Sequence, residues 1–440
     1  MEEISSITAL GLAFLVIMGL LIFFLPRRLV FLPFIITVSY MTLGQQVIIA
    51  GLHFDICRIL LQFGLIRLLI RREVKKFDFT IIDKLIIALS AASVITATML
   101  TPTMDTFINR MGWAYDTLLA FFLFRFLVRN MDEIIFMIKI TAIVILPLAL
   151  SMIIEKSTQR NIFYIYGVAP EFTIIREGRL RCQGPFRHPI LAGTFGATLF
   201  PLFFALWNKQ TKGRAFAYIG IISSTIITVM SASSGPLMAY LAALIGLFFW
   251  PLRDKMRVVR WALLTGIAML AVFMKAPIWF LISRLSEITG GTGEARSLVI
   301  DQAVKHVSEW WLLGTTYTAH WAADNGLITL PHDPDNIDIT NQYIFIGVQG
   351  GILPLILFIL IIWYCFQELG KTRHMLTVQS SYKQFIPWAL GCALFAHAVT
   401  FISVVYFDQM RLMWAFLLSI IAFVASLSIK KKNQKCYYDQ

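Results

Sequence analysis

Repeated apolar runs of roughly 20 residues constrain this chain more than any other feature. The first extends from Ile4 to Leu25, and similar runs recur to the end of the sequence. About 20 apolar residues are the length at which a helix crosses a bilayer. The composition agrees, because 58% of residues are hydrophobic and 14% charged, against about 45–50% and 25% in soluble domains. We therefore predict an all-α polytopic membrane protein with about 12–13 transmembrane helices.

This pattern excludes several other classes of protein. A soluble enzyme or a disordered chain would need far fewer apolar residues and more charge. An outer-membrane barrel would alternate apolar and polar residues instead of showing continuous runs. No internal repeat and no Gly/Ser-rich or Pro-rich linker divides the sequence, so residues 1–440 are predicted to form one membrane domain. The second and third predicted spans, 29–50 and 52–70, are separated only by Gly51.

The basic residues predict an orientation. The chain has 38 Lys and Arg against 25 Asp and Glu, a net charge of +13. In a membrane protein this excess is first a topology signal, because cytoplasmic loops collect Lys and Arg, and we expect no nucleic-acid partner. Most of these residues fall in short cytoplasmic loops if the N-terminus lies outside and the C-terminus inside. Residues 155–187 and 282–342 then form two long outer loops.

The first outer loop ends in a cluster of arginines: Arg176, Arg179, Arg181 and Arg187. Positive charge is disfavoured outside, so the cluster requires a reason. Guanidinium groups bind phosphate oxygens in a bidentate manner, and His188-Pro189 opens a helix whose N-terminus also favours an anion. We predict a diphosphate site. The alternative is that these arginines bind lipid headgroups or pair with Glu155, Glu171 and Glu177.

A serine-rich turn and the second loop supply the other candidate residues. Ser233 and Ser234, in the turn 231–236, either line a cavity or simply cap a tight helical hairpin. Residues 294–311 have helical spacing and predict an interfacial helix with Trp310 and Trp311 at headgroup level. Further candidates follow in this loop: His332 and Asp338 as catalytic acid–base groups, and Thr340 and Asn341, with His188, as cavity-lining residues.

No cofactor or metal is expected. The five cysteines contain no CxxC pair, and Cys182 is the one predicted to lie in an outer loop away from a span. The segment His332-Asp333-Pro334-Asp335 has no established ligand spacing.

Charged residues inside the apolar runs are few and lie near predicted span ends: Asp55, Arg58, Asp116, Asp408 and Arg411. Ionisable groups within the membrane are functional candidates by default, but the interfacial positions of most of these residues favour a structural role over a functional one. A proton-coupled transporter should have carboxylates in mid-span and inverted repeats, and the sequence displays neither pattern.

Three segments in order resemble the O-antigen ligase and O-antigen polymerase superfamily. Arg181-Cys-Gln-Gly184-Pro-Phe-Arg187-His188-Pro189 resembles its Arg-x-x-Gly-x-Phe-x-x-Pro segment. Residues 231–235 resemble its Ser-Arg-Gly hairpin, with Ser234 in place of the arginine. Asn341-Gln342-Tyr343 and the run to Gly351 resemble its His-Asn segment, with Thr340 in place of the histidine.

The resemblance covers roughly residues 170–365 and implies a function. Members are glycosyltransferases of the bacterial inner membrane that transfer a glycan from undecaprenyl diphosphate to an acceptor hydroxyl on a lipid or glycan, without a metal. Arg181 and Arg187, helped by Arg176 and Arg179, would then bind the diphosphate. A transporter or flippase for a lipid-linked or anionic solute, and a non-catalytic relative, are the alternatives.

Overall fold

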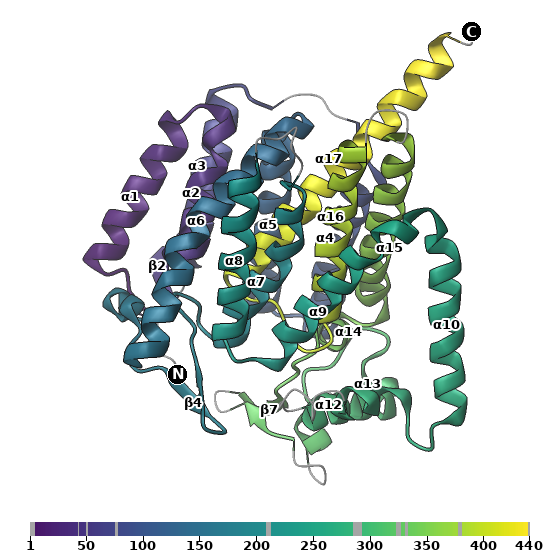
Figure 1. The fold of residues 1–440 in the computed structure, drawn as a ribbon. Helices are drawn as coiled ribbons and strands as arrows, with labels where there is room; N and C mark the ends of the chain where they lie inside the picture. Colours follow the sequence, from purple (N-terminus) through teal and green to yellow (C-terminus); the bar gives the residue numbers. More distant parts are fainter. Residues whose placement is uncertain are drawn as a thin grey trace.

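Helices dominate the architecture of the chain in a computed structural model. The structure describes residues 5–42, 44–49, 52–74, 78–207, 213–284, 293–322, 327–330, 333–376 and 381–438. Most helices stand roughly side by side in one bundle, and short strands and small helices gather at one end of it (Figure 1). The prediction of an all-α polytopic membrane protein is confirmed.

The helices of the bundle have the following bounds: α1 Ala9–Phe24, α2 Phe31–Tyr40, α3 Ile56–Ile70, α4 Ile81–Leu100, α5 Met104–Leu127, α6 Met131–Thr158, α7 Pro189–Phe204, α8 Arg214–Met230, α9 Ser234–Phe248, α10 Met256–Phe273, α14 Gln342–Gly350, α15 Ile352–Met375, α16 Ser381–Thr400 and α17 Gln409–Tyr438. Within the described residues, five helical segments are long and apolar enough to cross a membrane: 81–100, 131–158, 250–273, 352–375 and 409–428. Five further apolar helices are shorter.

The smaller elements are the helices α12 Gly293–Lys305 and α13 Val307–Trp310, and the strands β1 Ser5–Ser6, β2 Gln45–Ile49, β3 Leu52–Asp55, β4 Ile174–Arg176, β5 Arg179–Arg181, β6 Thr329–Leu330 and β7 Asp333–Ile337. The described residues also form short 3₁₀ helices: η1 Arg27–Leu29, η2 Ile162–Tyr166, η4 Trp250–Lys255, η5 Ile278–Phe280 and η6 Ala319–Ala322.

The second predicted span is wrong in its extent. Helix α2 ends at Tyr40, and the residues predicted to complete spans 29–50 and 52–70 instead form an antiparallel pair, β2 with β3. Its register places Val47 opposite Phe54. The β-branched run Val47–Ile49 favours a strand, and a short apolar run does not by itself distinguish strand from helix.

Helix α7 lies at the centre of the bundle, where it packs against α6, α8, α9 and α16. Almost all of its residues are buried. Gly193 and Gly196 make this close packing possible. A Cβ atom at Gly193 would lie 2.2 Å from the Oγ atom of Ser231, and one at Gly196 would lie 2.6 Å from the carbonyl oxygen of Ser224. The serine turn between α8 and α9 is thereby held against the first turns of α7.

The β4–β5 hairpin, α12, α13 and β6–β7 gather at one end of the bundle, which we call the loop end (Figure 1). The first described residues lie at this end and the last at the opposite end. The segment 294–311, predicted as one interfacial helix, forms two helices, α12 and α13. Trp310 is buried in a small core with Val299 and Trp321, whereas Trp311 is exposed.

Helix α10 stands apart from the rest of the bundle (Figure 1). None of its residues is buried, and apolar side chains such as Trp261 and Ile267 are more than half exposed. An apolar helix exposed on all sides is compatible with a lipid environment.

Candidate functional site

The end of the first loop is attached to the serine turn through Arg181. Its guanidinium Nη2 donates a hydrogen bond to the Oγ atom of Ser233, at 2.7 Å. The next residue, Cys182, donates its backbone N–H to the carbonyl oxygen of Met230 at the end of α8, at 3.1 Å. Arg181 is only 8% exposed. Residues from the first loop and the serine turn, about 50 positions apart in sequence, therefore share one site.

The glutamates near this site bind groups other than the guanidinium of Arg181. Glu155 accepts hydrogen bonds from the backbone N–H groups of Gln183 and Gly184, at 3.0 and 2.9 Å, and so fixes the loop that carries Arg181. Glu171 pairs with Arg160 at 3.5 Å. Pairing of a glutamate with the predicted arginine cluster is seen at Arg176, which lies 3.7 Å from its exposed neighbour Glu177.

Arg296, which the sequence analysis missed, enters the same site from the first turn of α12. Its Nη1 atom donates to the Oγ atom of Ser234 at 3.3 Å, and its side chain is 8% exposed. One sequence signal was available. Arg296 shares a helical face with Val299 and Ala303, which are buried, so a cation interrupts a stripe that should be apolar.

The charges at this site are strongly unbalanced. Among the described residues, neither Arg181 nor Arg296 has a carboxylate partner within ion-pair distance, and the Nε atom of Arg181 has no hydrogen-bond partner. Burial, together with the nearby Arg176 and Arg181, lowers the pKa of Arg296 to about 10. Burial and Arg176 likewise lower the pKa of Arg181. A buried charge is costly unless it is paired, so the site favours an anion.

Two helix N-termini add to this positive potential. Ser233 is the residue before α9, but it forms no side-chain capping bond: its hydroxyl oxygen accepts from Arg181, and its O–H donates to the carbonyl oxygen of Ser231 at 3.0 Å. The N–H groups of the first turn of α9 are therefore not capped by this serine. His188 precedes α7 and accepts the N–H of Ile190 at its Nδ1 atom, at 3.1 Å. Burial, Arg181 and Arg176 lower the pKa of His188 to about 4, so the ring is neutral near pH 7.

The other predicted site residues are placed less centrally. Arg176 and Arg179 are exposed on the β4–β5 hairpin. Arg187 forms an ion pair with Asp408, 3.2 Å from Nε to Oδ2. Asp338 is exposed, and its N–H donates to the carbonyl oxygen of Ile328. His332 lies outside the described residues.

Asn341 caps the N-terminus of α14. Its Oδ1 atom accepts the N–H groups of Tyr343 and Ile344 at the start of α14, and its Nδ2 atom donates to the carbonyl oxygen of Ile402. Thr340 precedes it at intermediate exposure. The cavity-lining roles of Thr340 and Asn341 stay predictions.

A separate cavity of about 200 Å³ lies among α3, α4, α5, α14, α15 and α17. All five charged residues that the sequence placed near span ends line it together: Asp55, Arg58, Asp116, Asp408 and Arg411. Arg110, which was not predicted, joins them. Arg58 pairs with Asp116, with 2.8 Å between Nε and Oδ1. Arg110 donates to the Oε1 atom of Gln349 at 2.9 Å. Asp408 lines this cavity and also pairs with Arg187, so the cavity is in contact with the end of the segment 155–187.

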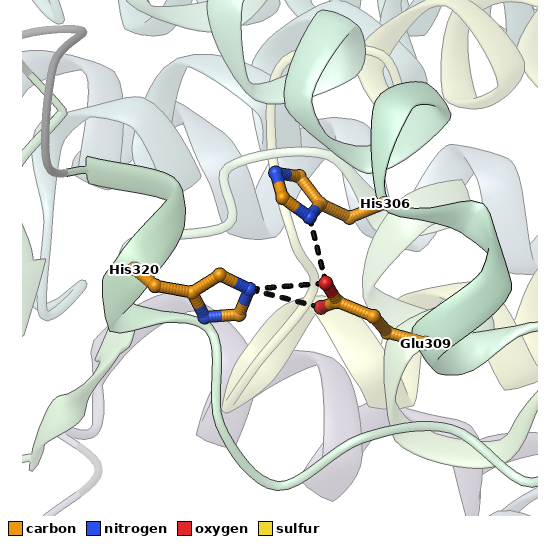
Figure 2. Close-up of side chains that lie close together, drawn as sticks. All are labelled: His306, Glu309 and His320. Carbon is orange, nitrogen blue, oxygen red and sulfur yellow. Dashed lines mark hydrogen bonds and ion pairs between the residues drawn. The ribbon is translucent and has the colours of Figure 1, made fainter.

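A third group of side chains, His306, Glu309 and His320, lies on the loop end (Figure 2). Both imidazole rings point at the carboxylate of Glu309. The sequence analysis did not bring these three residues together, although the i, i+3 spacing of His306 and Glu309 places them on one helical face.

The chain matches no known protein-family model and no curated protein sequence.

Proposed function

We propose that the chain is an outer-leaflet glycosyltransferase whose donor is a glycan linked to a polyprenyl diphosphate, of the O-antigen ligase or polysaccharide polymerase type. The observation that carries this proposal is the pair of buried guanidinium groups, Arg181 and Arg296, at the N-terminus of α9, neither of which has a carboxylate partner among the residues that the structure describes. Such a site favours an anion with several oxygens, because guanidinium groups bind phosphates in a bidentate manner.

The position of Arg296 also bears on the resemblance. The family's hairpin has an arginine where this chain has Ser234, and Arg296 brings a guanidinium group to the hydroxyl of that serine from α12. A positive group is thus available at the position where the resemblance leads us to expect one. This arrangement supports an active, divergent member over a relative without a diphosphate site.

The proposed chemistry is electrostatic. The acceptor hydroxyl oxygen forms a bond to the anomeric carbon of the donor sugar as the bond from that carbon to the diphosphate oxygen breaks. Negative charge grows on the leaving diphosphate, and Arg181 and Arg296 stabilise it, because fixed charges in a water-poor site stabilise such charge strongly. The acceptor proton requires a base, for which Asp338 and His332 stay predictions.

The charged cavity supports a second candidate, transport of an anionic or lipid-linked solute. Three arginines and three aspartates line it among helices of the bundle, and ionisable groups within a membrane often mark a solute path. The arginine site at the loop end is the stronger evidence, because Arg58 and Asp116 already neutralise each other.

Deletion of this chain in its native cell distinguishes the two functions. A transferase predicts accumulation of a polyprenyl-diphosphate-linked glycan on the outer leaflet, where a membrane-impermeant lectin or periodate reaches it in spheroplasts. A flippase predicts accumulation on the inner leaflet, where the glycan becomes accessible only after the membrane is opened. Accumulation inside, or no accumulation, contradicts the transferase proposal.

A further inference from the structure

His306, Glu309 and His320 come together from different parts of the second loop. His306 is the residue between α12 and α13, Glu309 lies within α13, and His320 lies in η6. The Nδ1 atom of His306 is 2.7 Å from Oε1 of Glu309, and the Nε2 atom of His320 is 3.0 Å from Oε2 (Figure 2). The three potential ligand atoms all lie within 4.8 Å of one another.

These distances are close to those that a metal ion requires. Zinc binds histidine nitrogen and carboxylate oxygen at about 2.0–2.2 Å, so two ligands of one tetrahedral ion lie about 3.3–3.5 Å apart. Small side-chain rotations would bring the three atoms to that separation. Two imidazoles and one carboxylate suit zinc and similar transition metals, whereas magnesium and calcium prefer oxygen ligands alone.

The side chains around the cluster hold it in place. Trp321 donates its indole N–H to Oε2 of Glu309 at 3.2 Å. The ring of His306 stacks on Trp321, with 5.5 Å between ring centroids, and that of His320 stacks on Tyr317, with 5.2 Å. Partners that orient metal ligands through hydrogen bonds and packing are typical of metal sites. All three ligands are one-third exposed or nearly so, which leaves a path for an ion.

The second loop also has a structural need for such a link. Its own core is small, with Val299, Ala303, Trp310, Trp321, Ile337 and Val348 as the buried members. Small folding units commonly gain a disulfide or a metal ion when their cores are limited. The described cysteines are free and lie outside this loop.

We propose that His306, Glu309 and His320 bind one zinc-class divalent metal ion, which joins the α12–α13 corner to η6 and takes water as its fourth ligand. The ion would hold the end of α12, whose first turn carries Arg296. Its role is structural, and the site stands independently of the proposed transferase activity. It departs from the expectation of no metal, which considered only the segment around His332.

The test uses the full-length protein, purified in detergent, stripped with EDTA and titrated with ZnCl₂ or CoCl₂. The wild type should bind one equivalent with a dissociation constant of about 1 μM or lower, and cobalt should give the visible absorption of a four-coordinate site. Glu309→Gln and His306→Ala should each weaken binding at least about tenfold. Glu294→Gln, which removes an exposed carboxylate from the same loop, should leave binding unchanged.

The proposal is overturned if the folded wild type binds no stoichiometric zinc, or if both ligand variants bind as tightly as Glu294→Gln. In either case the cluster is a hydrogen-bonded or ion-paired network only. If the ligand variants do not fold, the cobalt spectrum of the wild type decides the question alone. A six-coordinate spectrum with water-like ligands would exclude the site.

Discussion

Replacement of Arg296 by glutamine should change stability and ligand binding in opposite directions. Arg296 is buried beside Arg181 and Arg176, and its pKa falls from an ordinary 12.5 to about 10. The side chain is charged in both folded and unfolded states below pH 10, so burial of this charge destabilises the folded protein at all physiological pH values. The shift in pKa corresponds to a loss of folding free energy of at most about 3 kcal/mol. Glutamine removes the charge and keeps a donor for Ser234.

The same change should weaken diphosphate binding. A hydrogen bond between charged partners contributes about 1.5–3 kcal/mol, so loss of one lowers affinity by about 10- to 150-fold. Thermal unfolding in detergent, followed by tryptophan fluorescence with and without farnesyl diphosphate, measures both effects. Without ligand, Arg296→Gln should unfold at a higher temperature than the wild type. With ligand, it should gain less stability.

The control for this experiment is Lys305→Gln, in the last turn of the same helix. Lys305 is 61% exposed and pairs with Asp301 at 2.7 Å. Its loss should therefore change neither the unfolding temperature nor the stabilisation by farnesyl diphosphate appreciably. The reasoning is refuted if Arg296→Gln is less stable than the wild type without ligand and equally stabilised by farnesyl diphosphate. Arg296 would then be a structural residue of α12.

Three further predictions follow from the described contacts. Arg181→Lys should reduce farnesyl diphosphate binding at least tenfold because the planar fork is lost, whereas Arg187→Lys should have a smaller effect because lysine preserves its ion pair; equal effects would contradict the distinction. As the pH falls from 6.5 to 4, the unfolded chain protonates His188 before the folded protein does, because the pKa of the folded ring is about 4. The free energy of unfolding of the wild type should therefore fall by up to about 3 kcal/mol over this range, and His188→Asn should abolish that fall. Chemical denaturation across the range measures the effect, and an unchanged pH profile would exclude the neutral ring. In intact cells, an impermeant thiol reagent should label Ile175→Cys and leave Lys255→Cys unlabelled; the reverse result would invert the predicted orientation.

The cysteine positions illustrate what the sequence could not supply. Cys182 was expected to lie in an outer loop away from a span, but it is fully buried. Its N–H is bound to the end of α8, and Glu155 binds the N–H of the next residue. Burial raises the pKa of Cys182 to about 12. Loop membership does not predict exposure when the loop folds back on the bundle. An introduced cysteine at exposed position 175 is therefore the better label.

Apolar length predicted the membrane helices because a chain in lipid must satisfy its backbone hydrogen bonds internally. Apolar length did not distinguish helix from strand in the short segments Gln45–Ile49 and Leu52–Asp55, whose backbone groups pair with each other as β2 and β3. Pairings between distant positions also escaped prediction, since composition and periodicity are local properties. The contacts of Arg296 with Ser234 and of Arg187 with Asp408 span 62 and more than 200 residues. The arginine cluster itself was visible, because four cations in a loop predicted to lie outside contradict the expected charge pattern.

Turnover of a defined donor in proteoliposomes tests the central claim most directly. Purified protein is reconstituted with a polyprenyl-diphosphate-linked oligosaccharide and an acceptor glycan, and both free polyprenyl diphosphate and extended acceptor are measured. The wild type should release one diphosphate for each glycan transferred. The double variant Arg181→Lys/Arg296→Lys should be at least a hundredfold slower at equal protein levels, because two bidentate contacts are lost. Near-normal transfer by this variant would contradict the diphosphate site on which the account depends.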